Sequence, residues 1–299
     1  MRWMKTSMCL ALIGLFCVAT TAAETINVRD LGAVGDGKAD DTAALQKALD
    51  MMKQPDAGRL LVPAGRYRIT ETLQFRVKSS RQIVLTGEGK KSVLFWDGDD
   101  GGTLLRSYGM GHSELRDLMF TGQPLGKLTP EQRARRAGIL FHAVSERGGN
   151  HINRMANVMF RQAEVGVQMG RGRRDFCNAD YAFTHVHASQ LGTFFLVRND
   201  QGVDYLFNFL FALDCDTVFD FQRGGNLTVN NAQLTKCGLF LHIDGGGRNA
   251  GTYICTNVRH EHARKPMVAR DQLLKATDIE WEQAVVRFIG FDDAQWTWF

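Results

Sequence analysis

The sequence is poor in proline and carries little excess charge of either sign: its 299 residues include 5 prolines, and the formal net charge is +4. Hydrophobic residues make up 44% of the chain. This excludes an intrinsically disordered protein, because disorder requires low hydrophobicity and high net charge. The 31 glycines follow no regular short period, which excludes collagen. The small net charge gives no reason to expect nucleic acid as a partner.

Long apolar runs are lacking outside the N-terminus. Arg2 and Lys5 precede an apolar stretch from Met8 to Ala19, and small residues follow as far as Ala23. This order is typical of a secretory signal peptide over residues 1–23, and the stretch is too short to cross a bilayer. We therefore expect a mature chain over residues 24–299 that is secreted, periplasmic or at the cell surface, without membrane contact after signal cleavage.

Cysteine is also scarce. Two of the six cysteines fall within the predicted signal peptide, and the mature chain keeps Cys177, Cys215, Cys237 and Cys255. This density is too low for a disulfide scaffold, and the paired spacing of a zinc site is missing. Buried free thiols are the favoured interpretation, a single disulfide is the alternative, and a metal site is disfavoured.

The second half of the chain contains a repeat of 21 to 28 residues. Six short β-type segments align in one register: 157–160, 185–188, 209–212, 231–234, 257–260 and 278–281. A repeat of this length is typical of a coil of stacked strands. Because alternate strand residues face opposite sides, the second position of each segment is predicted to point inward and the third outward. The inward column is Val158, Val186, Leu210, Ala232, Val258 and Ile279. His260 falls on an inward position, and Cys215 and Cys237 share one offset on neighbouring turns.

The first mature segment carries the most specific pattern. It reads VRDLGAVGDGKADDTAALQKALD followed by GRLLVPAGRYRI, a glycine-rich loop, a helix that Asp40 or Asp41 could cap, and two strands. This segment resembles the entry module of the pectate-lyase-like superfamily, and more narrowly the rhamnogalacturonase/epimerase-type proteins. The resemblance implies an all-β fold, a single-stranded right-handed parallel β-helix with a short N-terminal capping α-helix. It also implies a structural role for the acidic pair Asp40 and Asp41.

We expect one β-helix domain over residues 24–299, with the entry module at about residues 26–69. The final segment, from Phe288 to Phe299, is apolar and has no evident capping helix. Open ends of a coil need a cap or a partner. Either these aromatic residues fold over the last turn, or the sequence is incomplete at the C-terminus.

Outward positions of the repeat place several functional groups on adjacent turns. Asp214, Lys236 and His262 share one offset, Arg259 and Glu280 share another, and Glu261 lies two residues after Arg259. Neighbouring turns lie about 4.8 Å apart, and next-neighbours lie at about twice that distance. This scale suits two carboxylates in glycoside hydrolysis. It equally suits a lyase or epimerase, in which a base removes a proton beside a uronate carboxylate that a cation or an arginine neutralises. The alternative is an ordinary charged surface, because a register error of one residue turns any column inward.

No cofactor is identified from the sequence, and calcium is left open. The loop from Asp97 to Gly102 is acidic, but the twelfth position counted from Asp97 is Tyr108 and not the glutamate of an EF-hand. His185 and His187 are outward candidates that lack a carboxylate partner in the sequence.

The resemblance implies carbohydrate chemistry without specifying a reaction. The ordered motifs of polygalacturonases and the Asp-Pro-His motif of alginate-type epimerases are absent from this sequence. The leading hypothesis is a secreted enzyme, a lyase or glycoside hydrolase, that cleaves or modifies an acidic, pectin-like polysaccharide, with the arginines of residues 171–174 attracting uronates. The alternative is a non-catalytic β-helix that binds glycans or serves as a surface-structural protein, oligomeric as tailspikes are.

Overall fold

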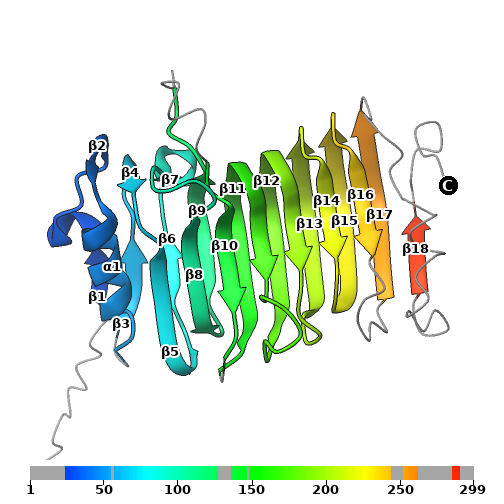
Figure 1. Ribbon diagram of the computed structural model, residues 1–299, viewed down its shortest axis with the longest axis horizontal. Helices are drawn as coiled ribbons and strands as arrows, with labels where there is room; N and C mark the ends of the chain where they lie inside the picture. The colour runs from blue at the N-terminus through cyan, green and yellow to red at the C-terminus, as the bar shows by residue number, and fades with distance from the viewer. Residues whose placement is uncertain are drawn as a thin grey trace, which may run out of the picture.

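The computed structural model describes residues 24–54, 57–126, 136–146, 148–243, 252–261 and 285–289, with backbone alone for 24, 57, 78–80, 260 and 285–289 (Figure 1). The predicted signal peptide and the candidates His262 and Glu280 lie outside these ranges, as do Ile279 and the side chain of His260.

Parallel strands dominate the structure. Eighteen strands join in one continuous sheet that winds around a shared core, so that each coil stacks on the previous one (Figure 1). The strands of the first half are β1 (Glu24–Asn27), β2 (Asp36–Asp40), β3 (Ala57–Leu61), β4 (Gly65–Ile69), β5 (Leu73–Arg81), β6 (Val84–Thr86), β7 (Ser92–Trp96), β8 (Thr103–Met110) and β9 (Glu114–Thr121). Those of the second half are β10 (Ile139–Val144), β11 (Asn150–Met169), β12 (Asn178–Val197), β13 (Val203–Leu213), β14 (Thr217–Phe221), β15 (Gly225–Thr235), β16 (Leu239–Ile243), β17 (Thr252–Glu261) and β18 (Val285–Ile289).

Each full coil has three sides, which the strand pairing defines. Side A contains β1, β3, β6 and the first parts of β9, β11, β12, β13, β15 and β17. Side B contains β2, β4, β7 and the later parts of β9, β11, β12, β13, β15 and β17. Side C contains β5, β8, β10, the last parts of β11 and β12, and then β14 and β16. A long strand such as β11 therefore contributes to all three sides.

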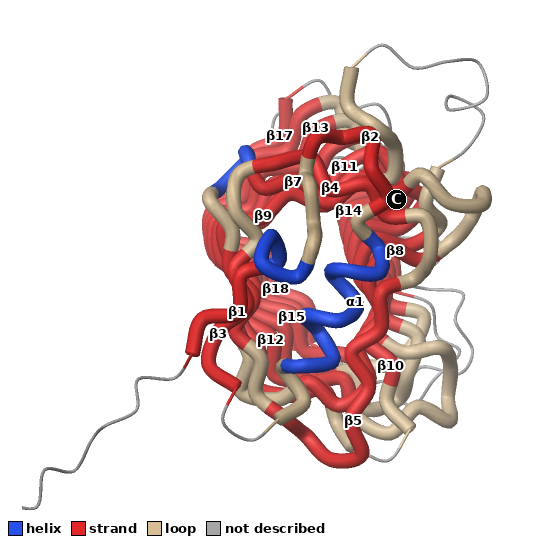
Figure 2. Tube along the Cα trace, turned by 90° about the vertical axis from the view of Figure 1, so that its left-hand side faces the viewer, coloured by secondary structure: helices blue, strands red, loops and turns tan. Residues whose placement is uncertain are grey.

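The α-helix α1 (Thr42–Met51) lies over the N-terminal end of the coil (Figure 2). It buries Leu45, Ala48 and Leu49, and the Gln46 side chain exchanges two hydrogen bonds with the backbone of Gln74 on β5. Two short 3-10 helices, η1 (Val28–Leu31) and η2 (Gly89–Lys91), interrupt the first coils.

The acidic pair of the entry segment is structural, as predicted. Asp41 is 1% exposed, and its carboxylate accepts hydrogen bonds from the backbone N–H groups of Val34 and Gly35. Asp40 accepts from the backbone and the hydroxyl of Thr42 and from the hydroxyl of Thr70. Both carboxylates fix the glycine-rich loop and the start of α1.

The predicted register of the repeat is confirmed over five turns. The inward column is buried throughout the described residues: Val158, Val186, Leu210, Ala232 and Val258. The first column differs from the prediction of regular strand. Its residues, from Asn157 to Asn257, adopt positive φ near 55° and form the bend between sides A and B. This bend turns the chain without a loop, because one left-handed residue changes the direction of an otherwise extended backbone.

The four described cysteines are free thiols, and three of them are buried. Cys215 and Cys237 lie in contact on neighbouring coils. Their contact and their burial raise the pKa of the Cys215 thiol well above its usual range. Within the described part of the chain, no helix has the length and apolarity to cross a membrane.

Candidate functional site

Two of the predicted site residues occupy the corner between sides B and C. Asp214 and Lys236 lie at the same offset on consecutive coils, with positive φ of 57° and 53°. The backbone N–H of Asp214 donates to Thr235 O, and that of Lys236 donates to Glu261 O, each at 2.9 Å. The corner backbone thus accounts for their alignment.

Arg259 and Glu261 lie further along, on side B. Arg259 Nη2 and Glu261 Oε1 form an ion pair of 2.8 Å within β17, and the Arg259 side chain is 70% exposed. The structure therefore places four of the six predicted residues on one outer edge of the coil. The catalytic role of this group stays a prediction.

Side C carries a second row of functional groups, which the sequence analysis missed. Its outward positions pair from coil to coil, so that the side chains form one row along the coil: Arg106, His142, Gln168, Leu196, Asp220 and His242. Neighbouring members lie about one strand spacing, roughly 4.8 Å, apart.

The first half of this row is buried. His142 is 4% exposed, and its Nε2 lies 3.3 Å from both Gly170 O and Gln168 Nε2. Burial, and then the charge of Arg106, lower the pKa of His142 to about 4. His142 is therefore neutral at pH 7. Arg106 donates to Thr103 Oγ1 and forms no ion pair with a described carboxylate.

The second half of the row holds an acid–base pair. His242 Nδ1 lies 2.8 Å from Asp220 Oδ1, and the two side chains are 23% and 14% exposed. Gln222 Nε2 donates to the other oxygen of Asp220 at 3.2 Å. When the Nδ1–H group of a neutral His242 donates to this carboxylate, the lone pair of the ring is on Nε2.

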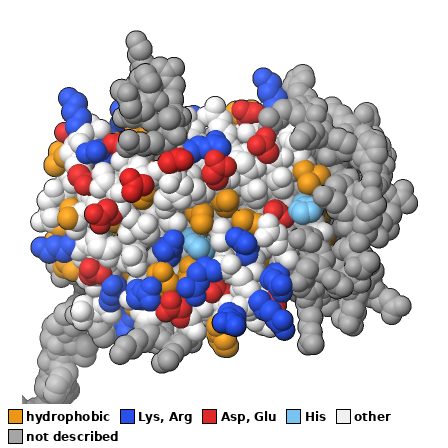
Figure 3. Space-filling view, viewed as in Figure 1, with side chains coloured by type: hydrophobic (Ala, Val, Ile, Leu, Met, Phe, Trp, Pro, Cys, Tyr) orange, Lys and Arg blue, Asp and Glu red, His pale blue; other side chains and the backbone are white. Residues whose placement is uncertain are grey.

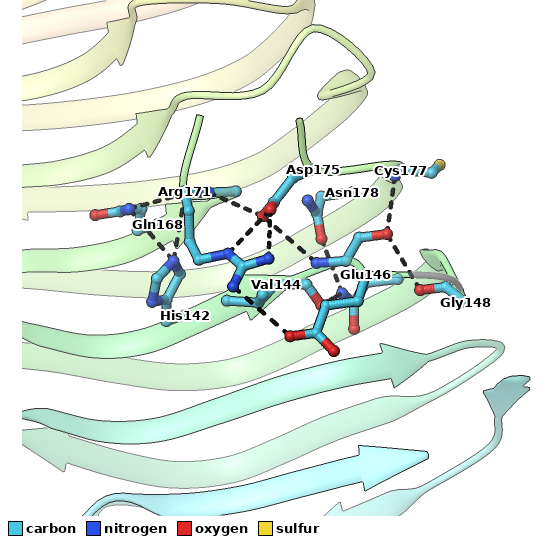
Figure 4. A network of polar contacts seen from close by, with 12 residues as sticks. His142, Val144, Glu146, Gly148, Gln168, Arg171, Asp175, Cys177 and Asn178 are labelled. Atoms are coloured by element: carbon cyan, nitrogen blue, oxygen red, sulfur yellow. Dashed lines mark hydrogen bonds and ion pairs between the residues drawn. The ribbon is translucent and has the colours of Figure 1, made fainter. Parts of the chain in front are cut away.

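A buried carboxylate shapes the basic loop beside this row (Figure 4). Asp175, 5% exposed, accepts from the backbone N–H and Nε of Arg171 at 2.9 and 3.0 Å, and from the backbone N–H of Ser145 at 3.5 Å. Arg171 also lies 3.7 Å from Glu146. This network closes the loop that presents Arg173 and Arg174.

Lys and Arg side chains gather over the lower half of the face seen in Figure 3, toward the ends of β8 and β10. Some of the loop arginines have carboxylate partners, since Arg223 Nη1 donates to Asp200 at 2.7 Å and Arg173 lies 3.7 Å from the same residue. Arg174 and Arg198 are exposed, and neither forms an ion pair with a described carboxylate. The face therefore has positive charge available for an anionic ligand.

A signal for this row is present in the sequence. Glycine precedes an apolar run at the start of several side C strands, at Gly102, Gly138, Gly192 and Gly238. A Cβ at Gly138 would lie 2.4 Å from Gly101 O, and one at Gly238 would lie 2.3 Å from Asp216 O. The close approach of neighbouring coils thus requires glycine at this corner, and its recurrence marks the start of the strand that carries the row.

The described residues contain no group of three or more His, Cys, Asp or Glu side chains that could hold a metal ion. The acidic loop proposed as a calcium candidate uses its carboxylates internally: Asp97 accepts from Arg68 Nε at 2.6 Å, and Asp100 accepts from the backbone N–H of Arg136 at 3.0 Å. What the face offers chemically is a carboxylate-oriented imidazole beside several guanidinium groups.

The fold and the row on side C together define a parallel β-helix protein in which arginine-bearing loops lie beside a row of polar side chains. Residues 25–239 match the model of the family described as rhamnogalacturonase A/epimerase, pectate lyase-like, and the chain belongs to this family. The expected resemblance is confirmed.

Several characterised proteins are similar to parts of this chain. Mannuronan C5-epimerase AlgE2 of Azotobacter vinelandii is 40% identical over 106 residues, which are 32% of this chain and 11% of that protein. Alginate lyase 7 of the same organism is 38% identical over 79 residues, 25% of this chain and 9% of that protein. The chain thus matches about a tenth of the length of these relatives.

Solved structures share the fold. A 1,3-alpha-1,4-beta-D-galactose-4-sulfate-3,6-anhydro-D-galactose-2-sulfate 4 galactohydrolase superposes with a TM-score of 0.53 at 16% identity, covering 81% of this chain and 72% of that one. Pantoea stewartii WceF, a glycan biofilm modifying enzyme with a tailspike-like parallel β-helix, superposes with a TM-score of 0.50 at 13% identity, covering 88% of this chain and 41% of that one.

Proposed function

We propose that this protein is an enzyme that modifies a uronate-containing polysaccharide at side C, with His242 as the base that Asp220 orients. The observation that carries the proposal is the 2.8 Å contact between His242 Nδ1 and Asp220 Oδ1 in an outward row beside arginine-rich loops. The similarity to mannuronan epimerases and to an alginate lyase supports a polyuronate as the substrate.

The composition of the row favours proton abstraction over hydrolysis. Glycoside hydrolysis uses a pair of carboxylates, and Asp220 is the one carboxylate among the six residues of the row. The proton on the carbon that bears a carboxylate becomes removable when the carboxylate charge is neutralised. Arg198 and Arg223, which follow β12 and β14, are the guanidinium groups beside the Asp220–His242 part of the row that suit this role.

Two outcomes of the abstraction are consistent with this arrangement. In both, Nε2 of His242 accepts the proton, and the imidazolium is stabilised by Asp220. In epimerisation, water delivers a different proton to the opposite face of the carbanion, which inverts the carbon, and the His242 imidazolium then releases its proton to water. Alternatively, the electron pair forms a carbon–carbon double bond while the neighbouring glycosidic C–O bond breaks and the leaving oxygen takes up a proton, which is lyase chemistry.

The test is an assay of the purified protein on a panel of polyuronates and neutral polysaccharides. Ultraviolet absorbance reports unsaturated lyase products, and deuterium incorporation from D2O, followed by proton NMR, reports epimerisation. We expect one of these signals on a polyuronate and its loss in His242→Gln. The control is His112→Gln, which replaces an exposed histidine that contacts His151 and lies outside the row. Full activity of His242→Gln would overturn the assignment of the base, and reducing ends without either signal would indicate a hydrolase.

We further propose export of the chain, based on the signal-peptide pattern of residues 1–23.

We also propose that helix α1 caps a right-handed coil. It has the contacts expected of a cap, because its apolar face lies against the first coils and Gln46 forms hydrogen bonds with the backbone of β5.

A further inference from the structure

The bend between sides A and B consists of one residue per coil with a left-handed backbone conformation, and six such residues form a column along the coil axis. Its members are Asp117, Asn157, His185, Phe209, Asn231 and Asn257, with φ between 52° and 60°. Asparagine and aspartate tolerate this conformation best among residues with a side chain. Asn157 Nδ2 donates to Asp117 Oδ1 at 2.7 Å, and Asn257 Nδ2 donates to Asn231 Oδ1 at 3.3 Å. Hydrogen bonds between polar side chains on successive coils, here called the polar ladder, therefore stabilise both ends of the column.

The middle of the column breaks this ladder. His185 and Phe209 stack with ring centroids 4.8 Å apart and an interplanar angle of 6°. Phe209 is 49% exposed, and a bulky aromatic residue at positive φ is disfavoured. Burial does not explain this choice, because the ring faces solvent. An exposed, strained aromatic pair points to a binding role.

The pair forms one wall of a trough along the coil axis. The cavity has a volume of about 530 Å³, with the left-handed column except Asp117 on one wall and the outward side B residues on the other. The second wall consists of Met159, His187, Phe211 and Gln233. His187 and Phe211 pack edge to face with centroids 4.6 Å apart. Aromatic rings therefore line both walls at the same two coils.

The polar groups of the trough suit an anionic glycan. None of the described lining residues carries a carboxylate, and Lys90 lies among them. Asn231, Gln233 and Asn257 supply amides that can both donate and accept. His187 Nε2 is buried and has no hydrogen-bond partner among the described residues. Burial, and then the charge of Arg161, lower the pKa of His187, which favours its neutral imidazole.

We propose that this trough is a second, non-catalytic binding groove for a uronate-containing polysaccharide chain, remote from the row on side C. The aromatic faces would stack on the C–H faces of the sugar rings, and the amides would bond the hydroxyl groups. The uronate nature of the ligand rests on the proposed function. The trough extends over successive coils at a constant strand spacing, which fits an extended polymer rather than a compact ligand.

The test compares variants in the His242→Gln background, so that no substrate is consumed. Phe209→Asn combined with His185→Asn restores ladder residues that favour the left-handed conformation, so we expect a melting temperature equal to or above that of the parent. We expect binding of long polyuronate, measured by calorimetry and affinity electrophoresis, to weaken about tenfold or more. The matched control is Leu206→Ala, which removes another exposed apolar side chain, 41% exposed, outside the trough.

With His242 intact, the double variant should process short oligouronates like the parent and lose efficiency on long chains. Unchanged polymer binding by the folded double variant would overturn the groove while leaving the proposed function standing. A parent that neither binds nor modifies any polyuronate would instead overturn the proposed function and with it the ligand. A concentration-dependent dimer that the double variant abolishes, without any effect on glycan binding, would show that the trough receives a second copy and would also overturn the proposal.

Discussion

His242 on β16 and Asp220 on β14 lie one coil apart and meet through Nδ1 and Oδ1 at 2.8 Å. Their positions, 22 residues apart in the sequence, become neighbours because the coil repeats with that spacing at this point.

We expect Asp220→Asn to keep the fold but to lower kcat by about 100-fold or more, because an amide neither favours the Nδ1–H tautomer nor stabilises an imidazolium. Steady-state kinetics on a polyuronate would check this. Asp204→Asn is the control, since Asp204 is exposed on side A and bonds to Asn226. Equal loss in both variants would point to a general structural effect.

Asp175 holds the loop that presents the arginines beside the row. Asp175→Ala removes the acceptor of the backbone N–H groups of Arg171 and Ser145, so we expect a loss of about 1–3 kcal/mol in the free energy of unfolding. Urea denaturation would measure it. KM for an anionic substrate should rise as well, because the loop arginines lose their positions. A stable variant with unchanged KM would contradict this role.

The buried His142 should make the protein sensitive to acid. Its pKa is lowered to about 4 in the folded state, so the unfolded chain binds the proton first as the pH falls. Stability therefore rises with pH between about 4 and 6.5, and falls as the solution is acidified through this window. We expect His142→Gln to remove about 2 kcal/mol of the stability difference between about pH 7 and about pH 4.5. Urea titrations at both pH values would test this, with His112→Gln as the exposed control. An identical pH profile in His142→Gln and wild type would contradict it.

The two adjacent aspartates of the entry segment should differ in their effect on stability. Asp41→Ala removes the buried carboxylate that accepts the backbone N–H groups of Val34 and Gly35, and we expect a loss of about 1–3 kcal/mol in the free energy of unfolding. Asp40→Ala exposes its partners to water and should cost less. Thermal unfolding of both variants decides the order, and the reverse order would show that the loop does not depend on Asp41.

Local patterns predicted much of the fold. The entry segment, with its glycine-rich loop and helix, indicated the family, and the alternation in the repeat identified inward residues such as Val186 and Leu210 correctly. The bend at Asn157 escaped this reasoning, because one left-handed residue inside a strand leaves no break in hydrophobic alternation. The four described candidate residues lie on adjacent coils as expected, because the same repeat register aligns them: Asp214, Lys236, Arg259 and Glu261.

The sequence by itself determined the coil and its inward column, because these depend on local periodicity, and its resemblance to the family implied the structural role of Asp41. Only the tertiary structure revealed the row on side C, in which His142 meets Arg106 and His242 meets Asp220. Tertiary structure also decided that His185 and Phe209 stack on the outer wall of a trough. The physical reason is that turn lengths vary from coil to coil. Which residues stack is therefore set by the register of backbone hydrogen bonds between coils, and not by a constant spacing along the chain.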